Sequence, residues 1–190
     1  MAPALTRATP RRLALAAVAL LAVAFLVAMV MSGRTRPMQS LVAFKAGGLM
    51  SETPAQVDRV ELIVGERRAT FVRTASGGWQ IGAGPAAADL AAGVAAHLET
   101  SVKFMHVTAP VRTLSRDEYQ AALGEYGLDP PRYTVALHAG ARPVLAARFG
   151  AKNPQELFQY VQVEGRPTLY LVPVFVGQEW ERVMDAIKPS

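Results

Sequence analysis

The three histidines, His97, His106 and His138, have the most versatile side chains in this sequence, because imidazole binds metals and transfers protons near neutral pH. They fall on three different expected elements, and none pairs with another at a ligand spacing. A zinc site needs three or four converging ligands, often with two of them on one element. The chain also has no cysteine. The sequence therefore predicts no metal site, and places the histidines at the surface or at the boundary of the core.

Catalytic motifs are also missing. No G-x-S-x-G elbow presents a serine nucleophile, and the segment Gly82-Ala83-Gly84-Pro85 lacks the later glycine and lysine of a phosphate-binding loop. Glu179 and Glu181 stand two apart on an expected helix, so they point to different sides of it. We therefore predict no catalytic residue, no cofactor and no enzymatic activity. An enzyme whose site is invisible in a single sequence is the alternative.

Five aromatic residues, Trp79, Tyr126, Tyr160, Tyr170 and Trp180, form the last set with chemical potential. Stacking on a bound ligand is one interpretation. Packing in the core and at its boundary is the other, and it is the commoner role of such residues in a modest sheet.

An apolar run of 19 residues, Leu13 to Met31, contains no charge and no proline. As a helix it would extend roughly 28 Å, close to the thickness of a bilayer's hydrocarbon core. The sequence therefore predicts a transmembrane signal anchor over residues 13–31, preceded by a basic tail (1–12) and followed by a juxtamembrane linker (32–54). A cleaved signal peptide is the alternative, but the run is long for one and lacks a small-x-small cleavage site.

Positive charge is concentrated around this run. Six of the 20 basic residues and no acidic residue lie within residues 1–45, which leaves 14 basic against 15 acidic residues afterwards. Nucleic-acid binders concentrate positive charge on the folded domain, so nucleic acid is not an expected partner. We predict contact with membrane lipid through residues 13–31. The expected location is the bacterial inner membrane, with a single pass and the C-terminal domain in the periplasm.

Residues 55–188 are long enough for one domain. Alternating and β-branched residues predict strands, and apolar residues at a spacing of four predict a helix that Pro85 opens. The expected strands are 57–64, 69–74, 79–81, 133–138, 144–149, 158–163 and 168–172; the expected helices follow Pro85, Ser115 and Pro173. Ser115 and Glu118 form a capping-box pattern. The predicted fold class is α+β: a single N-terminal transmembrane helix, then one small domain of antiparallel β-hairpins with two or three packed helices.

A turn rich in proline and glycine links the two halves of this domain. It contains Tyr126, Gly127, Leu128 and Pro130. We expect Gly127 to adopt a backbone conformation that other residues resist, and Leu128 to pack under the sheet. These four residues are predicted to be a structural turn.

Several short motifs, taken in order, resemble the domain-of-unknown-function family DUF4340. They are Val60-Glu61-Leu62, Gly78-Trp79-Gln80-Ile81, Glu125 to Pro131, Phe149 to Pro154, Tyr160 to Val163 and Thr168 to Val172. The resemblance covers about residues 57–185. This chain departs from the family pattern at Leu169 and in Gly150-Ala151-Lys152. The family has no catalytic residues to carry over, and its members include envelope proteins associated with ABC-type transport components. The resemblance therefore implies an accessory role.

The C-terminal helix is the candidate partner surface. It carries more apolar side chains than one face of a short helix can bury, and we assign partner binding to Phe175, Trp180 and Met184. The alternative for Trp180 is a place in the core. The predicted function is a non-enzymatic, membrane-anchored accessory protein whose domain docks onto a protein complex of the cell envelope, such as an ABC-type transport component. A module that binds a small molecule, peptide or glycan beside a transporter is the alternative.

Overall fold

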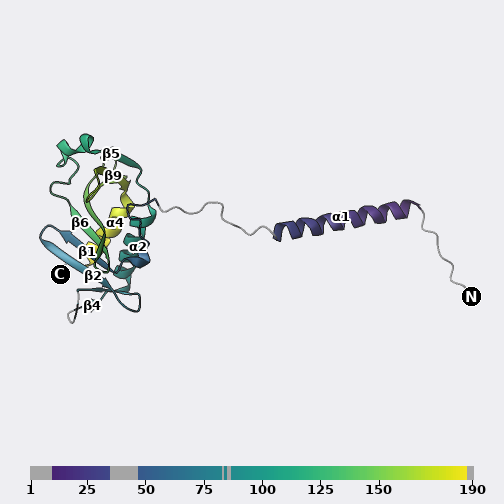
Figure 1. Ribbon diagram of the computed structural model, residues 1–190, viewed down its shortest axis with the longest axis horizontal. Helices are drawn as coiled ribbons and strands as arrows, with labels where there is room; N and C mark the ends of the chain where they lie inside the picture. Colours follow the sequence, from purple (N-terminus) through teal and green to yellow (C-terminus); the bar gives the residue numbers. More distant parts are fainter. Residues whose placement is uncertain (1–9, 35–46, 83, 85–86, 188–190) are drawn as a thin grey trace, which may run out of the picture. The chain divides into compact units, whose positions relative to one another are not determined.

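The computed structural model describes residues 10–34, 47–82, 84 and 87–187 (Figure 1). The chain forms two compact units, one over Met1–Phe44 and one over Lys45–Ser190. The predicted basic tail and the predicted linker lie mostly outside the described residues.

Helix α1 (Pro10–Arg34) is the described part of the first unit. Its side chains are described at Ala14 and over residues 17–29, where they are exposed. Within the described parts of the chain, no helix combines the length and the apolar character that crossing a membrane requires.

This finding overturns the predicted signal anchor over residues 13–31. The predicted single-pass location in the inner membrane, with a periplasmic domain, depended on that anchor. Both predictions were wrong because they took the apolar character of the sequence as sufficient evidence for a membrane span. The predicted contact with membrane lipid stays a prediction.

The described part of the second unit is built on one antiparallel sheet of nine strands, in the order β4-β3-β2-β1-β6-β7-β8-β9-β5. The strands are β1 (Arg59–Val64), β2 (Arg67–Arg73), β3 (Trp79–Ile81), β4 (Ala88–Asp89), β5 (Arg112–Ser115), β6 (Tyr133–Ala139), β7 (Arg142–Lys152), β8 (Phe158–Val163) and β9 (Thr168–Pro173). The hairpins merge because β1 pairs with β6 as well as with β2. The predicted fold class is thus corrected to one continuous sheet with helices, and no helix among the described residues is long and apolar enough to cross a membrane.

Two long helices cover one side of the sheet, which we call the helix face. Helix α2 (Ala92–Val107) packs beside α4 (Val174–Ala186), as Figure 1 also shows. Alternate residues of the central strands point toward these helices, since successive side chains of a strand point to opposite faces. The core here includes Val60, Leu62, Phe71, Leu98, Val102, Val135, Phe149, Val161, Trp180 and Val183, all fully or almost fully buried.

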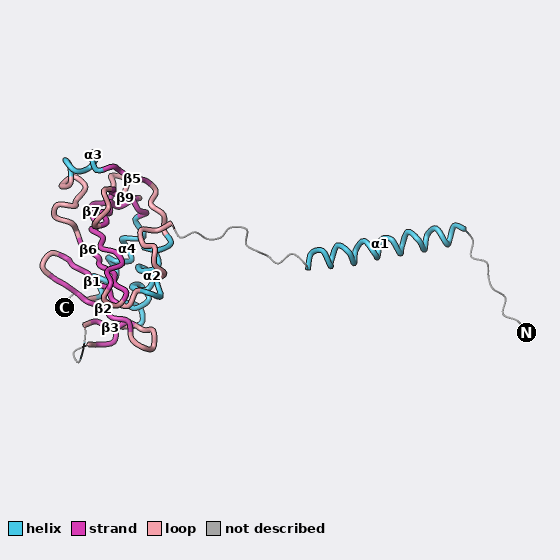
Figure 2. Tube along the Cα trace, in the orientation of Figure 1, coloured by secondary structure: helices cyan, strands magenta, loops and turns pink. Residues whose placement is uncertain are grey.

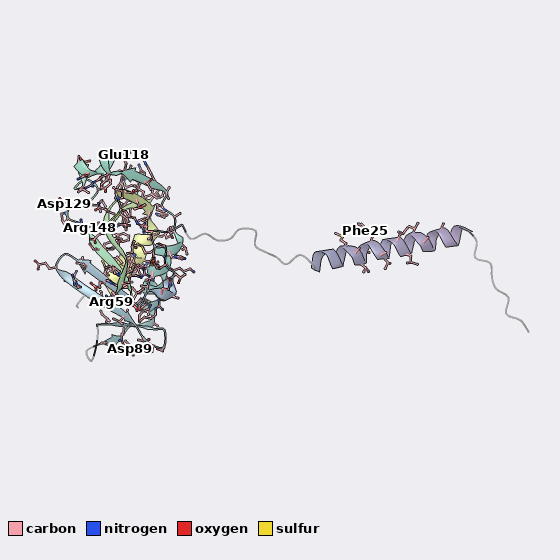
Figure 3. All side chains as sticks on the ribbon, viewed as in Figure 1. Phe25, Arg59, Asp89, Glu118, Asp129 and Arg148 are labelled. Carbon is pink, nitrogen blue, oxygen red and sulfur yellow. The ribbon has the colours of Figure 1, made fainter. Side chains whose placement is uncertain are left out.

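The opposite side of the sheet, which we call the turn face, has a smaller core. Helix α3 (Arg116–Tyr119), the 3-10 helix η3 (Gln120–Ala122) and the following turn cover β8, β9 and β5 there. The buried residues are Leu114, Tyr119, Leu128 and Leu169. Figure 2 shows α3 beside β5, at the end of the unit opposite to β3. Glu118 on α3 and Asp89 on β4 mark these two ends in Figure 3.

The folded unit begins earlier than the predicted residue 55. Leu49 and Met50 are buried in the core of the helix face, ahead of the 3-10 helix η1 (Pro54–Gln56). The amides of Gly48 and Met50 donate hydrogen bonds to the carbonyl oxygens of His106 and Met105, at 2.9 and 2.8 Å. These bonds satisfy carbonyls at the end of α2 that have no partner within the helix.

The start of α2 also differs from the prediction. Pro85, the expected first residue, lies outside the described residues. Ala88 and Asp89 pair with Ile81 and Gln80 of β3 instead of entering the helix, and α2 begins at Ala92. Pairing with a neighbouring strand therefore outweighs the helix propensity of the alanine-rich segment.

Candidate ligand-binding cavity

A cavity of about 830 Å³ lies on the helix face, between the sheet and the last turn of α4. Its floor is formed by aliphatic side chains of β1, β2 and β3: Leu62, Val64, Ala69 and Ile81. Met184 and Ile187 form the wall on the side of α4. Ligand pockets typically measure about 300–1,000 Å³ and are mostly apolar. By size and by lining, this cavity falls in that class.

Strand register and one small residue create this space. Leu62 lies opposite Ala69 across the β1–β2 pair, and both face the helix side. Because Ala69 carries only a methyl group, it leaves room above the sheet that a larger side chain would fill. Helix α4 ends at Ala186, so its last turn borders the space.

Five charged residues line the cavity: Arg67, Arg68, Arg132, Glu181 and Asp185. Two of them form ion pairs with neighbouring side chains. Lys152 Nζ is 3.5 Å from Glu181 Oε2, and Arg68 Nη1 is 3.8 Å from an oxygen of Glu61.

Asp185 also has an interaction partner. Within the described part of the chain, Arg67 and Arg132 make no ion pair and no side-chain hydrogen bond. Positive charge is therefore in excess at the mouth of the cavity.

Tyr133 lines the inner side of the cavity and belongs to a buried polar group. Its hydroxyl donates a hydrogen bond to the carbonyl oxygen of Gly177, at 3.3 Å. A Cβ atom on Gly177 would overlap Gln159 Oε1, so glycine allows α4 to approach β8 closely. Burial, assisted by the carboxylate of Glu181, raises the pKa of Tyr133 well above its usual value. The phenol therefore stays protonated and cannot act as a base near neutral pH.

A second, smaller hollow of about 420 Å³ lies on the turn face. Three arginines from three elements line it: Arg116 of α3, Arg148 of β7 and Arg166 of the β8–β9 turn. Gln162 Nε2 donates a hydrogen bond to the hydroxyl oxygen of Tyr119 at its floor, at 3.3 Å. We call this the turn-face hollow. It lacks the aliphatic floor of the first cavity.

The three residues predicted to bind a partner have three different environments. Trp180 is 0% exposed and packs in the core of the helix face, so it cannot contact a partner, and its assignment is corrected. Phe175 is 42% exposed, with its ring centroid 5.0 Å from that of Phe104. Met184 lines the cavity. Trp180 is buried because α4 packs against both the sheet and α2. Helix α2 covers the side of α4 that the sequence analysis expected to be exposed to a partner.

The predicted structural turn lies under the turn face. Gly127 has φ 63°, in the left-handed region, and a Cβ atom there would fall 2.7 Å from the backbone nitrogen of Ala151. That nitrogen donates a hydrogen bond of 2.8 Å to the carbonyl oxygen of Tyr126. Leu128 is buried, and the peptide bond from Asp129 to Pro130 is cis. The turn thus joins β7 to the smaller core.

The histidines have partners that their spacing in the sequence could not reveal. His97 Nδ1 lies 2.7 Å from Glu179 Oε2, a hydrogen-bonding contact between α2 and α4, and Glu179 also pairs with Arg182. His106 Nδ1 lies 3.2 Å from the carbonyl oxygen of Met50, and His138 Nε2 lies 3.7 Å from Glu61 Oε1. Over the residues that the structure describes, no group of three or more His, Cys, Asp or Glu side chains is arranged to hold a metal ion.

The five aromatic residues do not form one stacking surface. Trp79 and Trp180 lie in the core of the helix face, where Arg73 Cζ stands 4.4 Å from the ring centroid of Trp79. Tyr126 and Tyr160 pack edge to face on the other side of the sheet, with centroids 4.7 Å apart. They stabilise two separate cores.

The arginines of the cavity were not recognised from the sequence. Arg67 lies between the expected strands 57–64 and 69–74, and Arg132 precedes the expected strand 133–138, but they are 65 positions apart and nothing in their spacing links them. Only the pairing of β1 with both β2 and β6 brings them to one end of the sheet.

Comparison of the chain with protein-family models, with curated proteins and with solved structures finds no match. The resemblance to DUF4340 therefore stays a prediction. The fold and the cavity define the class: an α+β domain with one nine-stranded antiparallel sheet, two helices over one face and a cavity beside the end of the second helix.

Proposed function

We propose that this protein is a non-enzymatic binding module whose cavity on the helix face captures a small amphipathic molecule. The observation that carries the proposal is the cavity of about 830 Å³ with an aliphatic floor and a few charged groups at its mouth. A small number of polar groups around an apolar pocket is the usual design of a ligand site. Binding there would remove apolar surface of both the ligand and the protein from water.

The side chains around the cavity suit binding better than catalysis. Arginine stays protonated, so Arg67, Arg68 and Arg132 cannot serve as general bases. Tyr133 is held in its protonated form. Glu181 is engaged by Lys152. A general base must be free to accept a proton from the substrate, and this arrangement supports a module without catalytic activity.

The binding function can be tested with Nile red, a neutral apolar dye whose fluorescence rises in apolar pockets. We expect saturable binding to the full chain. Ala69→Phe places a ring above the cavity floor and should weaken dye binding at least tenfold. Val72→Phe is the matched control, because residue 72 lies on the same strand and points to the opposite face. Equal binding by the wild-type protein and Ala69→Phe would contradict the proposal, provided that both variants melt cooperatively.

A second candidate is the docking function that the sequence predicted, and a separate observation favours it. Leu157 and Phe175 are 60% and 42% exposed. They lie close together because the amide of Val174 donates a hydrogen bond to the carbonyl oxygen of Leu157, at 2.9 Å. Exposed aromatic and aliphatic groups of this kind occur at protein–protein contacts.

In this second proposal, a protein partner contacts Leu157 and Phe175. The substitution Phe175→Asp should abolish co-purification of a stoichiometric partner. Val111→Asp, at a residue that is 59% exposed, is the control and should leave the complex intact. Loss of the complex in both variants, or in neither, would contradict docking through this patch.

A further inference from the structure

We infer that the ligand of the cavity on the helix face carries one anionic head group on an apolar body, and that Arg67 and Arg132 hold the head group. This inference rests on the proposed binding function and specifies its ligand class.

The two arginines come from strands on either side of β1 and meet at one end of the sheet. Val64 pairs with Arg67 of β2, and Ile63 pairs with Thr134 of β6. Arg132 stands just before β6, at the level of the turn that follows Val64. Both residues line the cavity, and both are exposed. A ligand at the mouth would therefore have a guanidinium on each side.

The surrounding charges leave these two arginines available. Arg68 is near Glu61, and Lys152 is near Glu181. Three guanidinium groups face two carboxylates around the cavity, and Lys152 offsets one of those carboxylates. A cationic ligand would meet this excess of positive charge, whereas an anionic one would be attracted by it.

Guanidinium chemistry also favours an oxyanion. Its planar array of N–H groups matches a carboxylate or phosphate with two parallel hydrogen bonds. The aliphatic floor, with Leu62, Ala69 and Ile81, offers no hydrogen-bond donor or acceptor from its side chains. It therefore suits the hydrocarbon part of the same molecule. Carboxylate and phosphate share the chemistry that the arginines recognise.

The test compares four probes with the same ten-carbon chain: decanoate, decyl phosphate, decanol and decyltrimethylammonium. Each displaces Nile red from the full-length protein below its micellar concentration. We expect the two anions to bind at least tenfold more tightly than decanol, and the cation to bind most weakly. The tighter of the two anions identifies the head group as carboxylate or phosphate.

Arg67→Gln and Arg132→Gln should each weaken anion binding about tenfold and leave decanol binding unchanged. Arg148→Gln, which removes a guanidinium from the turn-face hollow, is the matched control and should change neither. Raising the salt concentration should weaken binding of the anions more than that of decanol, because salt screens exposed charges.

Two results would overturn the inference, and they are distinguishable. If decanol binds as tightly as the anions, or if the arginine variants bind anions normally, the cavity binds ligands but the assigned ligand class is wrong. If none of the four probes displaces the dye, and Ala69→Phe binds the dye like the wild-type protein, the proposed binding function fails, and the inference fails with it.

Discussion

The two faces of the sheet are built from the same strands but bury different amounts of apolar surface. On the helix face, α2 and α4 cover the central strands, and the larger core lies beneath them. On the turn face, a helix of four residues and a turn cover only the last three strands of the order, around a much smaller core. Long helices supply a continuous apolar stripe, whereas a short helix and a turn rely on single side chains and backbone hydrogen bonds.

The hollows on the two faces differ in the same way. The cavity beside α4 has an aliphatic floor and charges at its mouth, whereas the turn-face hollow is lined by arginines and by Tyr119 and Gln162. The comparison shows that the covering elements, together with the strand side chains beneath them, decide what each face offers a ligand.

The largest expected effect is on the helix face. Trp180→Ala removes a fully buried indole and should lower the free energy of unfolding by about 3–5 kcal/mol, measured by chemical denaturation. Trp180→Phe should cost less, since within the described residues the indole nitrogen has no hydrogen-bond partner to lose. Phe175→Ala should change stability by under about 1 kcal/mol, because Phe175 is 42% exposed and lies at the edge of the core. A small effect of Trp180→Ala would mean that α4 contributes little to the core.

The smaller core should show the next effect. Leu169→Ala on β9 empties a fully buried site on the turn face and should cost about 2–4 kcal/mol. Leu157→Ala, at an exposed residue, is the control and should cost almost nothing. If Leu169→Ala proved as costly as Trp180→Ala, the two cores would contribute equally, and the contrast between the faces would be wrong.

Two glycines allow the cost of a left-handed backbone conformation to be measured separately from the cost of a steric clash at the turn around Gly127. Gly127 and Gly140 have nearly the same φ, 63° and 60°. A Cβ atom at Gly127 meets the backbone of Ala151, whereas one at Gly140 has nothing within 4 Å. Gly140→Ala should therefore cost about 1 kcal/mol, for backbone strain alone. Gly127→Ala should cost about 2–3 kcal/mol, because the backbone of β7 must also shift. Equal melting of the two variants would show that the turn is not held against β7.

The smallest effect concerns the polar start of α3. The amide and hydroxyl of Ser115 each donate a hydrogen bond of 2.7 Å to Glu118, and these bonds lower the pKa of Glu118 below its usual value. A carboxyl whose pKa is lower in the folded state stabilises the fold at pH values above its unfolded pKa, and that stabilisation is lost as the pH falls through the folded value. NMR titration should show that Ser115→Ala raises the pKa of Glu118. An unchanged titration would mean that the two residues are not hydrogen bonded in solution.

Local elements of the folded unit could be predicted from the sequence, because they depend on neighbouring residues. The expected strands 158–163 and 168–172 match β8 and β9 to within one residue, and the helix after Pro173 is α4. The pattern of Ser115 and Glu118 does mark the start of α3. Alternation, proline and capping residues act over a few positions, so their signal survives in the chain itself.

Two wrong predictions, the membrane anchor and the partner contact of Trp180, concerned features that do not follow from the local sequence pattern alone. Apolar character alone predicted a membrane anchor over residues 13–31, and the finding on the described helices overturned it. The apolar stripe of the last helix left Trp180 available to a partner, but packing of α4 beside α2 buried it.

The sequence by itself determined seven of the nine described strands, the final helix, the capped start of α3 and the turn around Gly127, since each follows from the chemistry of residues close in the chain. Tertiary structure alone decided that β1 pairs with β6, that Trp180 lies in the core and that Arg67 and Arg132 flank one cavity. Many pairings of strands would satisfy the same local patterns. The choice among them depends on the total apolar surface that each arrangement removes from water, which is a property of the whole fold.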